Sequence, residues 1–222
     1  MEPVIVAIDG PAGVGKSTTS RRVAERLGIP HIDTGAMYRA MALKATRAGI
    51  ALDDEPRLEA LGAGTRIDLE GSGQAQRVIL DGEDVSSAIR TPEMSMAASR
   101  VSAVPAVRRI LVRIQQEMGR RAGGVLEGRD IGTKVFPETP HKFFLTATPV
   151  VRSERRHRDL SERGIDQAVE DILREIETRD RQDSTRAESP LSWDDSYTVI
   201  DSSDLSLDEV VERIVREVGR GK

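Results

Sequence analysis

The chain contains no cysteine and few aromatic residues, and each shortage excludes a class of protein. Without cysteine among its 222 residues it has no disulfide scaffold, no cysteine zinc site and no thiol redox chemistry. Aromatic residues make up only 3% of the sequence, too few for a platform that stacks single-stranded nucleic acid. His31, His141 and His157 are scattered without metal-ligand spacing, so a zinc protein is not expected either.

Long apolar runs and a strong excess of one charge are also missing. The apolar run at residues 4–8 is far shorter than the roughly 20 residues of a membrane helix. The first residues lack the basic and small-residue signals of a secretory leader. The 33 basic and 37 acidic side chains leave a net charge of −4, so nothing global attracts nucleic acid or an anionic membrane. We expect a cytoplasmic monomer that binds neither nucleic acid nor membrane.

Short apolar segments alternate with amphipathic ones along most of the chain. Strands are expected at residues 4–8, 29–33, 124–127, 142–146 and 197–200. Helices are expected from Lys16 to Gly28, after Thr34 as its cap, over residues 106–121 and 151–163, around residues 169–176, and after the last strand. This alternation is typical of an α/β fold, in three layers, around a central parallel sheet.

Residues 53–105 interrupt that alternation. Glycines become frequent there, and two alternating runs at residues 66–70 and 77–81 predict strands of a small antiparallel sheet, with a turn at Asp81 and Gly82. We therefore expect a single domain over residues 1–222 that carries an inserted subdomain at residues 53–105.

A glycine-rich motif lies between the first expected strand and the first expected helix. Residues 10–17, Gly-Pro-Ala-Gly-Val-Gly-Lys-Ser, fit the P-loop pattern G-x-x-x-x-G-K-[ST] in the strand-to-helix context it requires. Its backbone N–H groups and the helix N-terminus are suited to nucleotide phosphates. Lys16 is expected to bridge the β- and γ-phosphates, and Ser17 to offer its hydroxyl to Mg²⁺. The expected ATP-binding residues in this segment are Gly10, Pro11, Ala12, Gly13, Val14, Gly15, Lys16, Ser17 and Thr18.

The P-loop alone does not identify the reaction, but arginines elsewhere narrow it. The guanine-reading tetrapeptide Asn-Lys-x-Asp of GTPases is absent. Arg39 and Arg129 follow expected strand ends, where open α/β sheets bind ligands. Arg179, Asp183 and Arg186 are spaced to share one helix face. Transfer between two phosphates needs such a second cationic cluster, so a kinase is favoured. A nucleotide switch or assembly ATPase stays an alternative.

Four separated motifs, in this order, resemble the bacterial cytidylate kinases. They lie at residues 10–17, 33–39 (Asp-Thr-Gly-Ala-Met-Tyr-Arg), 128–133 (Gly-Arg-Asp-Ile-Gly-Thr) and 179–186, the last followed by Ser-Pro-Leu at 189–191. The likeness covers essentially the whole chain. It implies a nucleoside monophosphate kinase that uses ATP and Mg²⁺ to phosphorylate CMP or dCMP, with a monophosphate-binding insert and a helical lid over residues 152–164. A kinase of UMP, of AMP or of a non-nucleotide acceptor stays open.

The resemblance also implies roles for single side chains. It assigns the acceptor phosphate to Arg39, Arg129 and Arg186, the ribose to Arg179 and Asp183, and the cytosine to Ser99, Arg108 and Asp130. The lid arginines Arg152, Arg155 and Arg156 would reach the transferring phosphates, Arg152 as part of the ATP site. The expected catalytic residues are Lys16, Arg129, Arg155 and Arg156. For Asp130, a helix cap or an ion pair with Arg129 stays an equal alternative.

Overall fold

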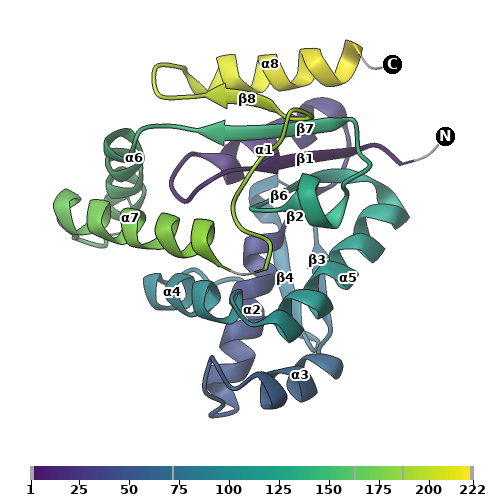
Figure 1. The fold of residues 1–222 in the computed structure, drawn as a ribbon, viewed down its shortest axis with the longest axis vertical. Coiled ribbons are helices and arrows are strands. Elements are labelled where there is room, and N and C mark those ends of the chain that lie inside the picture. The colour runs from purple at the N-terminus through teal and green to yellow at the C-terminus, as the bar shows by residue number, and fades with distance from the viewer. Residues whose placement is uncertain (1–2, 72, 163, 187, 221–222) are drawn as a thin grey trace.

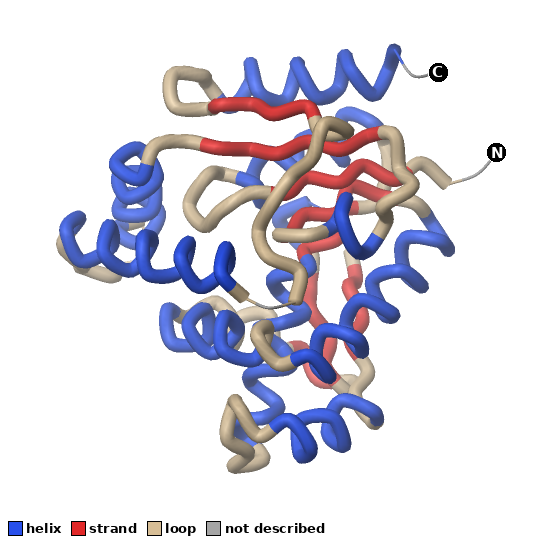
Figure 2. The backbone as a smooth tube through the Cα atoms, in the orientation of Figure 1, coloured by secondary structure: helices blue, strands red, loops and turns tan. Residues whose placement is uncertain are grey.

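A five-stranded parallel sheet forms the centre of the molecule, in the order β2-β6-β1-β7-β8 (Figures 1 and 2). The structure is a computed structural model that describes residues 3–71, 73–162, 164–186 and 188–220. Arg163 of the expected lid and the extreme ends of the expected domain lie outside the described residues. The strands are β1 (Ile5–Asp9), β2 (His31–Asp33), β6 (Gly124–Gly128), β7 (His141–Thr146) and β8 (Thr198–Asp201).

Side chains of β1 alternate between the two faces of this sheet. Val6 and Ile8 belong to a core shared with α1 (Lys16–Leu27) and α8 (Leu207–Arg220). Ile5 and Ala7 face the opposite core, which contains α5 (Pro105–Ala122) and the π-helical turn η2 (Ile131–Val135). Burial on both faces explains why β1 is continuously apolar. The predicted three-layer fold with a central parallel sheet is confirmed.

The segment predicted as an insert holds a second, antiparallel sheet. Its strands are β3 (Ile67–Glu70), β4 (Arg77–Leu80) and β5 (Glu83–Asp84). Asp81 and Gly82 make the tight turn between β4 and β5 with left-handed φ values of 51° and 91°, as the sequence predicts. The same segment also contains helices α3 (Glu55–Ala63) and α4 (Pro92–Val101) and the short η1 (Gly73–Ala75), which we did not predict.

Of these elements, β3, β4, α3 and α4 share one apolar core with α2 (Thr34–Arg47) and α5, below the main sheet in Figure 1. The expected cap of α2 is wrong by one residue. Asp33 is the N-cap, because its carboxylate accepts a hydrogen bond from the Ala36 amide at 2.9 Å. Thr34 is the first residue of the helix, and its hydroxyl donates to the Glu127 carbonyl oxygen at 2.6 Å.

A pair of helices, α6 (Pro149–Ser161) and α7 (Val169–Thr185), projects beyond one end of the sheet (Figure 1). A small cluster of Leu160, Ile172 and Ile176 joins the two helices. Since α7 continues to Thr185, Arg179 and Asp183 share one face of it and Arg186 follows as its C-cap, which confirms the predicted juxtaposition.

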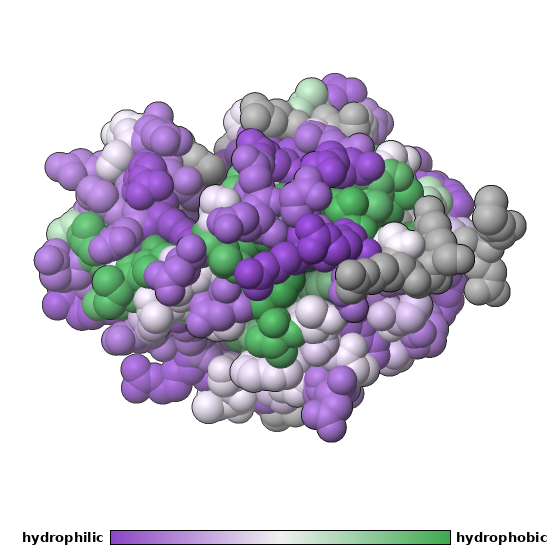
Figure 3. Space-filling model, turned by 90° about the horizontal axis from the view of Figure 1, so that it is seen from above, coloured by the Kyte–Doolittle hydropathy of each residue, from purple (hydrophilic) through white to green (hydrophobic). Residues whose placement is uncertain are grey.

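The face of the molecule that carries α8 is mainly hydrophilic, with apolar side chains in separate groups (Figure 3). Among the described residues no helix combines the length and apolar character needed to cross a membrane.

Candidate active site

The P-loop adopts a conformation that only glycine allows at several positions. Gly13 and Gly15 have left-handed φ values of 75° and 93°. At Gly10 a Cβ atom would lie 2.2 Å from the Leu145 carbonyl oxygen, so no side chain fits between the loop and β7. The loop leads directly into α1 at Lys16, which turns the free N–H groups of the first helical turn toward the loop.

A cavity of about 970 Å³ opens beside this loop. Its walls come from the P-loop, from α2, from α6 and from the antiparallel-sheet segment, including Gln76 and Thr91. The predicted site residues that line it are Gly13, Val14, Gly15, Lys16, Ser17, Thr18, Arg39, Arg155 and Arg156. A volume of this size suits a ligand of nucleotide dimensions.

Lys16 is buried, with 7% of its surface exposed, and its ammonium donates to the Pro11 carbonyl oxygen at 2.6 Å. Burial lowers its pKa well below the ordinary value, and the nearby Arg129 lowers it further. The carboxylates of Glu127 and Asp183 act in the opposite direction, but they do not offset burial and the nearby arginines, so an additional anion beside Lys16 would stabilise its charged form. The position of Lys16 therefore fits a bound phosphate.

Ser17 is the first member of a chain of polar side chains that the sequence did not predict. Its hydroxyl donates to Glu127 Oε2 at 2.7 Å, and Glu127 Oε1 lies 3.0 Å from His31 Nε2. Glu127 and His31 are both buried. The hydroxyl and carboxylate oxygens of Ser17 and Glu127 are hard donors of the kind Mg²⁺ prefers, so the residues present fit that ion. The only signal for Glu127 in the sequence was its place at a strand end.

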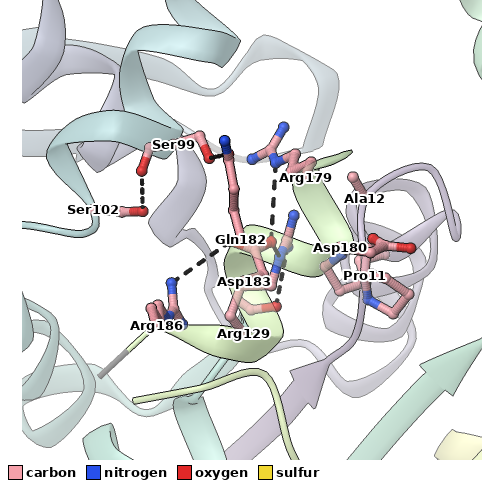
Figure 4. Close-up of polar contacts among 12 residues, drawn as sticks. Pro11, Ala12, Ser99, Ser102, Arg129, Arg179, Asp180, Gln182, Asp183 and Arg186 are labelled. Atoms are coloured by element: carbon pink, nitrogen blue, oxygen red, sulfur yellow. Dashed lines mark hydrogen bonds and ion pairs between the residues drawn. The ribbon is translucent and has the colours of Figure 1, made fainter. Parts of the chain in front are cut away.

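Asp183 is the centre of a second cluster, formed by arginines from two different elements (Figure 4). Arg129 Nε lies 2.8 Å from its carboxylate, Arg186 Nη1 3.7 Å and Arg179 Nε 4.0 Å. Burial alone would raise the pKa of Asp183, but Arg129 and Arg179 outweigh that effect and hold it below its ordinary value. Burial, followed by repulsion from Arg129, lowers the pKa of Arg179 to about 10. The cluster carries more positive charge than its one carboxylate balances.

Three guanidinium nitrogens near this cluster have no hydrogen-bond partner. Among the described residues, Arg39 Nε, Arg179 Nε and Arg186 Nη2 are buried donors without an acceptor. Native proteins rarely leave buried donors unpaired, and such groups commonly face a ligand. Three of them around a surplus of positive charge indicate a site for an anion.

Two of the three residues expected around cytosine, Arg108 and Asp130, lie next to Arg186, and the third, Ser99, contacts α7. Arg108 and Asp130 make a buried ion pair, and the Arg108 guanidinium stacks 5.7 Å from the centre of the Tyr38 ring. The Ser99 hydroxyl donates to Gln182 Oε1 at 3.3 Å (Figure 4). Of the two alternatives for Asp130, the cap holds in position alone: Asp130 is the N-cap residue of η2, but its side chain makes no cap hydrogen bond. The pair with Arg129 is wrong, because Arg129 pairs with Asp183 instead.

Of the three lid arginines, two line the cavity and one does not. Arg155 donates to Ser202 through both terminal nitrogens, at 3.0 and 2.6 Å, and lines the cavity with Arg156. Arg152 does not line it. Its guanidinium lies beneath the P-loop, where it donates to the Ala12 carbonyl oxygen at 3.1 Å. Its other nitrogens are directed at Ala147 and Asp180, so the side chain is placed for contacts within the protein rather than for the expected contact with a phosphate.

Asp9, at the end of β1, anchors the turn that carries Arg129 and Asp130. Its carboxylate accepts from the amides of Ile131 and Gly132, each at 2.9 Å, and from the Tyr197 hydroxyl at 2.8 Å. Burial nevertheless raises the pKa of Asp9 to about 6. No local pattern indicates this function, because the partners of Asp9 lie more than 120 residues away along the chain.

The raised pKa of Asp9 predicts a pH-dependent stability. Between its ordinary pKa of 3.8 and about 6, the folded chain binds this proton more tightly than the unfolded chain does. The contribution of Asp9 to the unfolding free energy therefore increases by roughly 2 kcal/mol as the pH falls from 7 to 4. Urea unfolding of wild type and Asp9→Asn across this pH range measures this contribution. The difference between the two unfolding free energies isolates Asp9, because the other carboxyl groups contribute equally to both proteins.

An exposed control, Asp204→Asn, is expected to keep the pH profile of wild type. A difference between wild type and Asp9→Asn that is constant from pH 4 to 7 would mean that the Asp9 carboxylate is ionised throughout.

A phosphate-binding loop beside a buried, arginine-rich anion site, both at the carboxyl ends of neighbouring parallel strands, defines a P-loop kinase. The comparisons with known proteins agree. The sequence model of the cytidylate kinase family matches residues 6–220. The chain belongs to the cytidylate kinase family.

Individual relatives are similar over nearly their whole length. Cytidylate kinase of Syntrophotalea carbinolica is 49% identical over 97% of this chain and 92% of its own. Cytidylate kinase of Geobacter sp. strain M21 is 48% identical with the same coverage. A solved structure of an uncharacterized protein from Eubacterium ventriosum superimposes with a TM-score of 0.56 at 14% identity over 99% of both chains, which shows a shared fold alone.

Proposed function

We propose that this chain transfers the γ-phosphoryl group of ATP to the 5′-phosphate of CMP or dCMP, giving ADP and CDP or dCDP. The observation that supports it best is the set of buried guanidinium nitrogens of Arg39, Arg179 and Arg186 that have no hydrogen-bond partner among the described residues. A hydrolytic switch has no use for a second anion site, whereas a kinase with a phosphorylated acceptor requires one.

ATP is the donor, held by residues 10–18 with Lys16 between the β- and γ-phosphates. The Ser17 hydroxyl, next to Glu127, would hold Mg²⁺. When bound, this ion neutralises charge between the two phosphates. The chain itself contributes the N–H groups of the loop and the first turn of α1, together with the ammonium of Lys16.

The acceptor lies on the arginine side. Its phosphate is bound by Arg39, Arg129 and Arg186. Its ribose is bound by Arg179 and Asp183, and its cytosine by Ser99, Arg108 and Asp130. A carboxylate that is kept ionised, as Asp183 is, accepts well from vicinal hydroxyls. Guanidinium groups match phosphate oxygens in a bidentate manner.

Catalysis in this scheme comes from position and charge, because a phosphate oxyanion needs little help from a general base. Arg155 and Arg156 stabilise the charge on the transferring group. Residues 53–105 form the monophosphate-binding insert, and residues 152–164 the lid that excludes water. The enzyme works as a cytoplasmic monomer without nucleic acid or membrane partners, and size-exclusion chromatography with light scattering tests its mass.

An acceptor panel tests the activity. With saturating Mg-ATP in a coupled ADP-release assay, CMP and dCMP are expected to support turnover. AMP is expected to give a kcat/KM at least about 100-fold lower, because adenine would leave the buried polar groups of Arg108 and Asp130 without matching partners. UMP tests the contribution of the cytosine amine. ADP release that does not depend on any acceptor would contradict the proposal.

A further inference from the structure

Arg152 uses its whole guanidinium for contacts within the protein. Nε donates to the Ala147 carbonyl oxygen at 3.1 Å, Nη1 to the Ala12 carbonyl oxygen at 3.1 Å, and Nη2 to Asp180 Oδ2 at 2.6 Å. The side chain is 4% exposed. One arginine thus joins the end of β7, the P-loop and α7, and its nitrogens are not available to the cavity.

The P-loop has no freedom to move without disturbing this arginine. A Cβ atom on Gly13 would lie 3.1 Å from the Arg152 carbonyl oxygen and 3.3 Å from its Cβ, so α6 packs directly on the loop backbone. Any shift of Ala12 or Gly13 as the loop closes on phosphates is therefore transmitted to Arg152.

On the other side, Arg152 holds the part of α7 that carries the acceptor cluster. Asp180 adjoins Arg179 in sequence and precedes Asp183 by three residues, so one helical turn connects the three. Figure 4 shows Asp180 next to Pro11 and Ala12, and Asp183 among the arginines. Asp180 Oδ1 is buried and has no hydrogen-bond partner, so its only anchor among the described residues is the ion pair with Arg152.

We infer that Arg152 and Asp180 are a positioning pair that couples the donor loop to the acceptor helix, so that binding of ATP strengthens binding of CMP and the reverse. Arg152 acts through Ala12 and Asp180 rather than on the phosphates. This inference depends on the proposed function, because it needs two nucleotide sites. Asp180 is 25% exposed, so the ion pair is only partly buried, and such a pair contributes more to the positions of the two segments than to stability.

Calorimetric titration of CMP, with and without saturating β,γ-imido-ATP and Mg²⁺, measures the coupling. In wild type the analogue is expected to lower the CMP Kd by about tenfold, and CMP to lower the analogue's Kd by the same factor. In Asp180→Asn and Arg152→Lys both factors are expected to fall to about two or less, while each nucleotide alone binds within about threefold of wild type. The double variant should lose no more of the coupling between the two nucleotides than either single variant does.

Asp171→Asn is the matched control, since this carboxylate pairs with Arg174 at the exposed start of α7. It should keep the coupling of wild type. Asp180→Glu retains the carboxylate and is expected to keep a factor of at least about four, which preserves the test if Asp180→Asn does not fold.

Three results would overturn the inference. The first is wild-type coupling in a folded Asp180→Asn, and the second is no coupling in wild type itself. The third is a loss of ATP-analogue binding in Arg152→Lys without a change in coupling, which would assign Arg152 to the phosphates. Failure of wild type to bind or phosphorylate CMP at all would instead refute the proposed function. The titration of wild type with CMP alone distinguishes failure of the proposed function from failure of the coupling.

Discussion

Replacing Lys16 with methionine is expected to lower kcat/KM by about 10³-fold, with most of the loss in kcat. The ammonium is placed where charge develops between the β- and γ-phosphates, and no other cation of the P-loop can replace it. Its hydrogen bond to the Pro11 carbonyl oxygen shows that the loop already holds it in place. Steady-state kinetics with varied CMP at saturating Mg-ATP measure the effect.

The same substitution is expected to leave stability unchanged or to increase it. Burial lowers the pKa of Lys16, so below its ordinary pKa the charged form costs folding free energy that methionine does not. Thermal unfolding should therefore give a Tm equal to or above that of wild type. The control Lys134→Met, at an exposed position, is expected to change neither kcat/KM nor Tm. A lower Tm together with the lost activity would indicate that Lys16 is structural.

Local patterns in the sequence predict most of the fold. The continuous β-branched run before Gly10, the helical spacing after Lys16 and the turn at Asp81 and Gly82 are each determined by neighbouring residues, and each is confirmed. The helices α3 and α4 were missed because frequent glycine and alternating runs in the same segment pointed to strands alone. Asp33 was missed as a cap because Thr34 is an equally good capping residue type.

The partners of the site residues could not be predicted in the same way. Spacing placed Arg179, Asp183 and Arg186 on one face, but nothing local indicates that Arg129 reaches Asp183 across 54 residues. The same holds for Asp130, which pairs with Arg108 through the packing of α5 on η2, and for Arg152 with Asp180. Such pairs depend on tertiary packing, which the spacing of residues along the chain does not indicate.

Replacing Arg186 with alanine is expected to lower kcat/KM for CMP by 10²- to 10³-fold and to leave the Kd of the ATP analogue within about threefold. Arg186 lies at the end of α7, half of its fork is committed to Ser189 and Asp183, and Nη2 is buried without a partner. That free nitrogen is the one that a phosphate oxygen of the acceptor would occupy. Arg186→Lys keeps the charge but loses the fork, so an intermediate loss is expected.

Arg181→Ala is the matched control, because Arg181 lies on the same helix but is exposed. It should leave both the CMP kinetics and the analogue Kd unchanged. The decisive quantity is the ratio of the two losses in Arg186→Ala. An acceptor-side arginine changes CMP turnover alone, whereas equal losses of turnover and analogue binding would place Arg186 on the donor side. Because Arg186 also pairs with Asp183, the carboxylate assigned to the ribose, a loss that is larger for CMP than for dCMP would instead mean that Arg186 acts through recognition of the ribose 2′-hydroxyl.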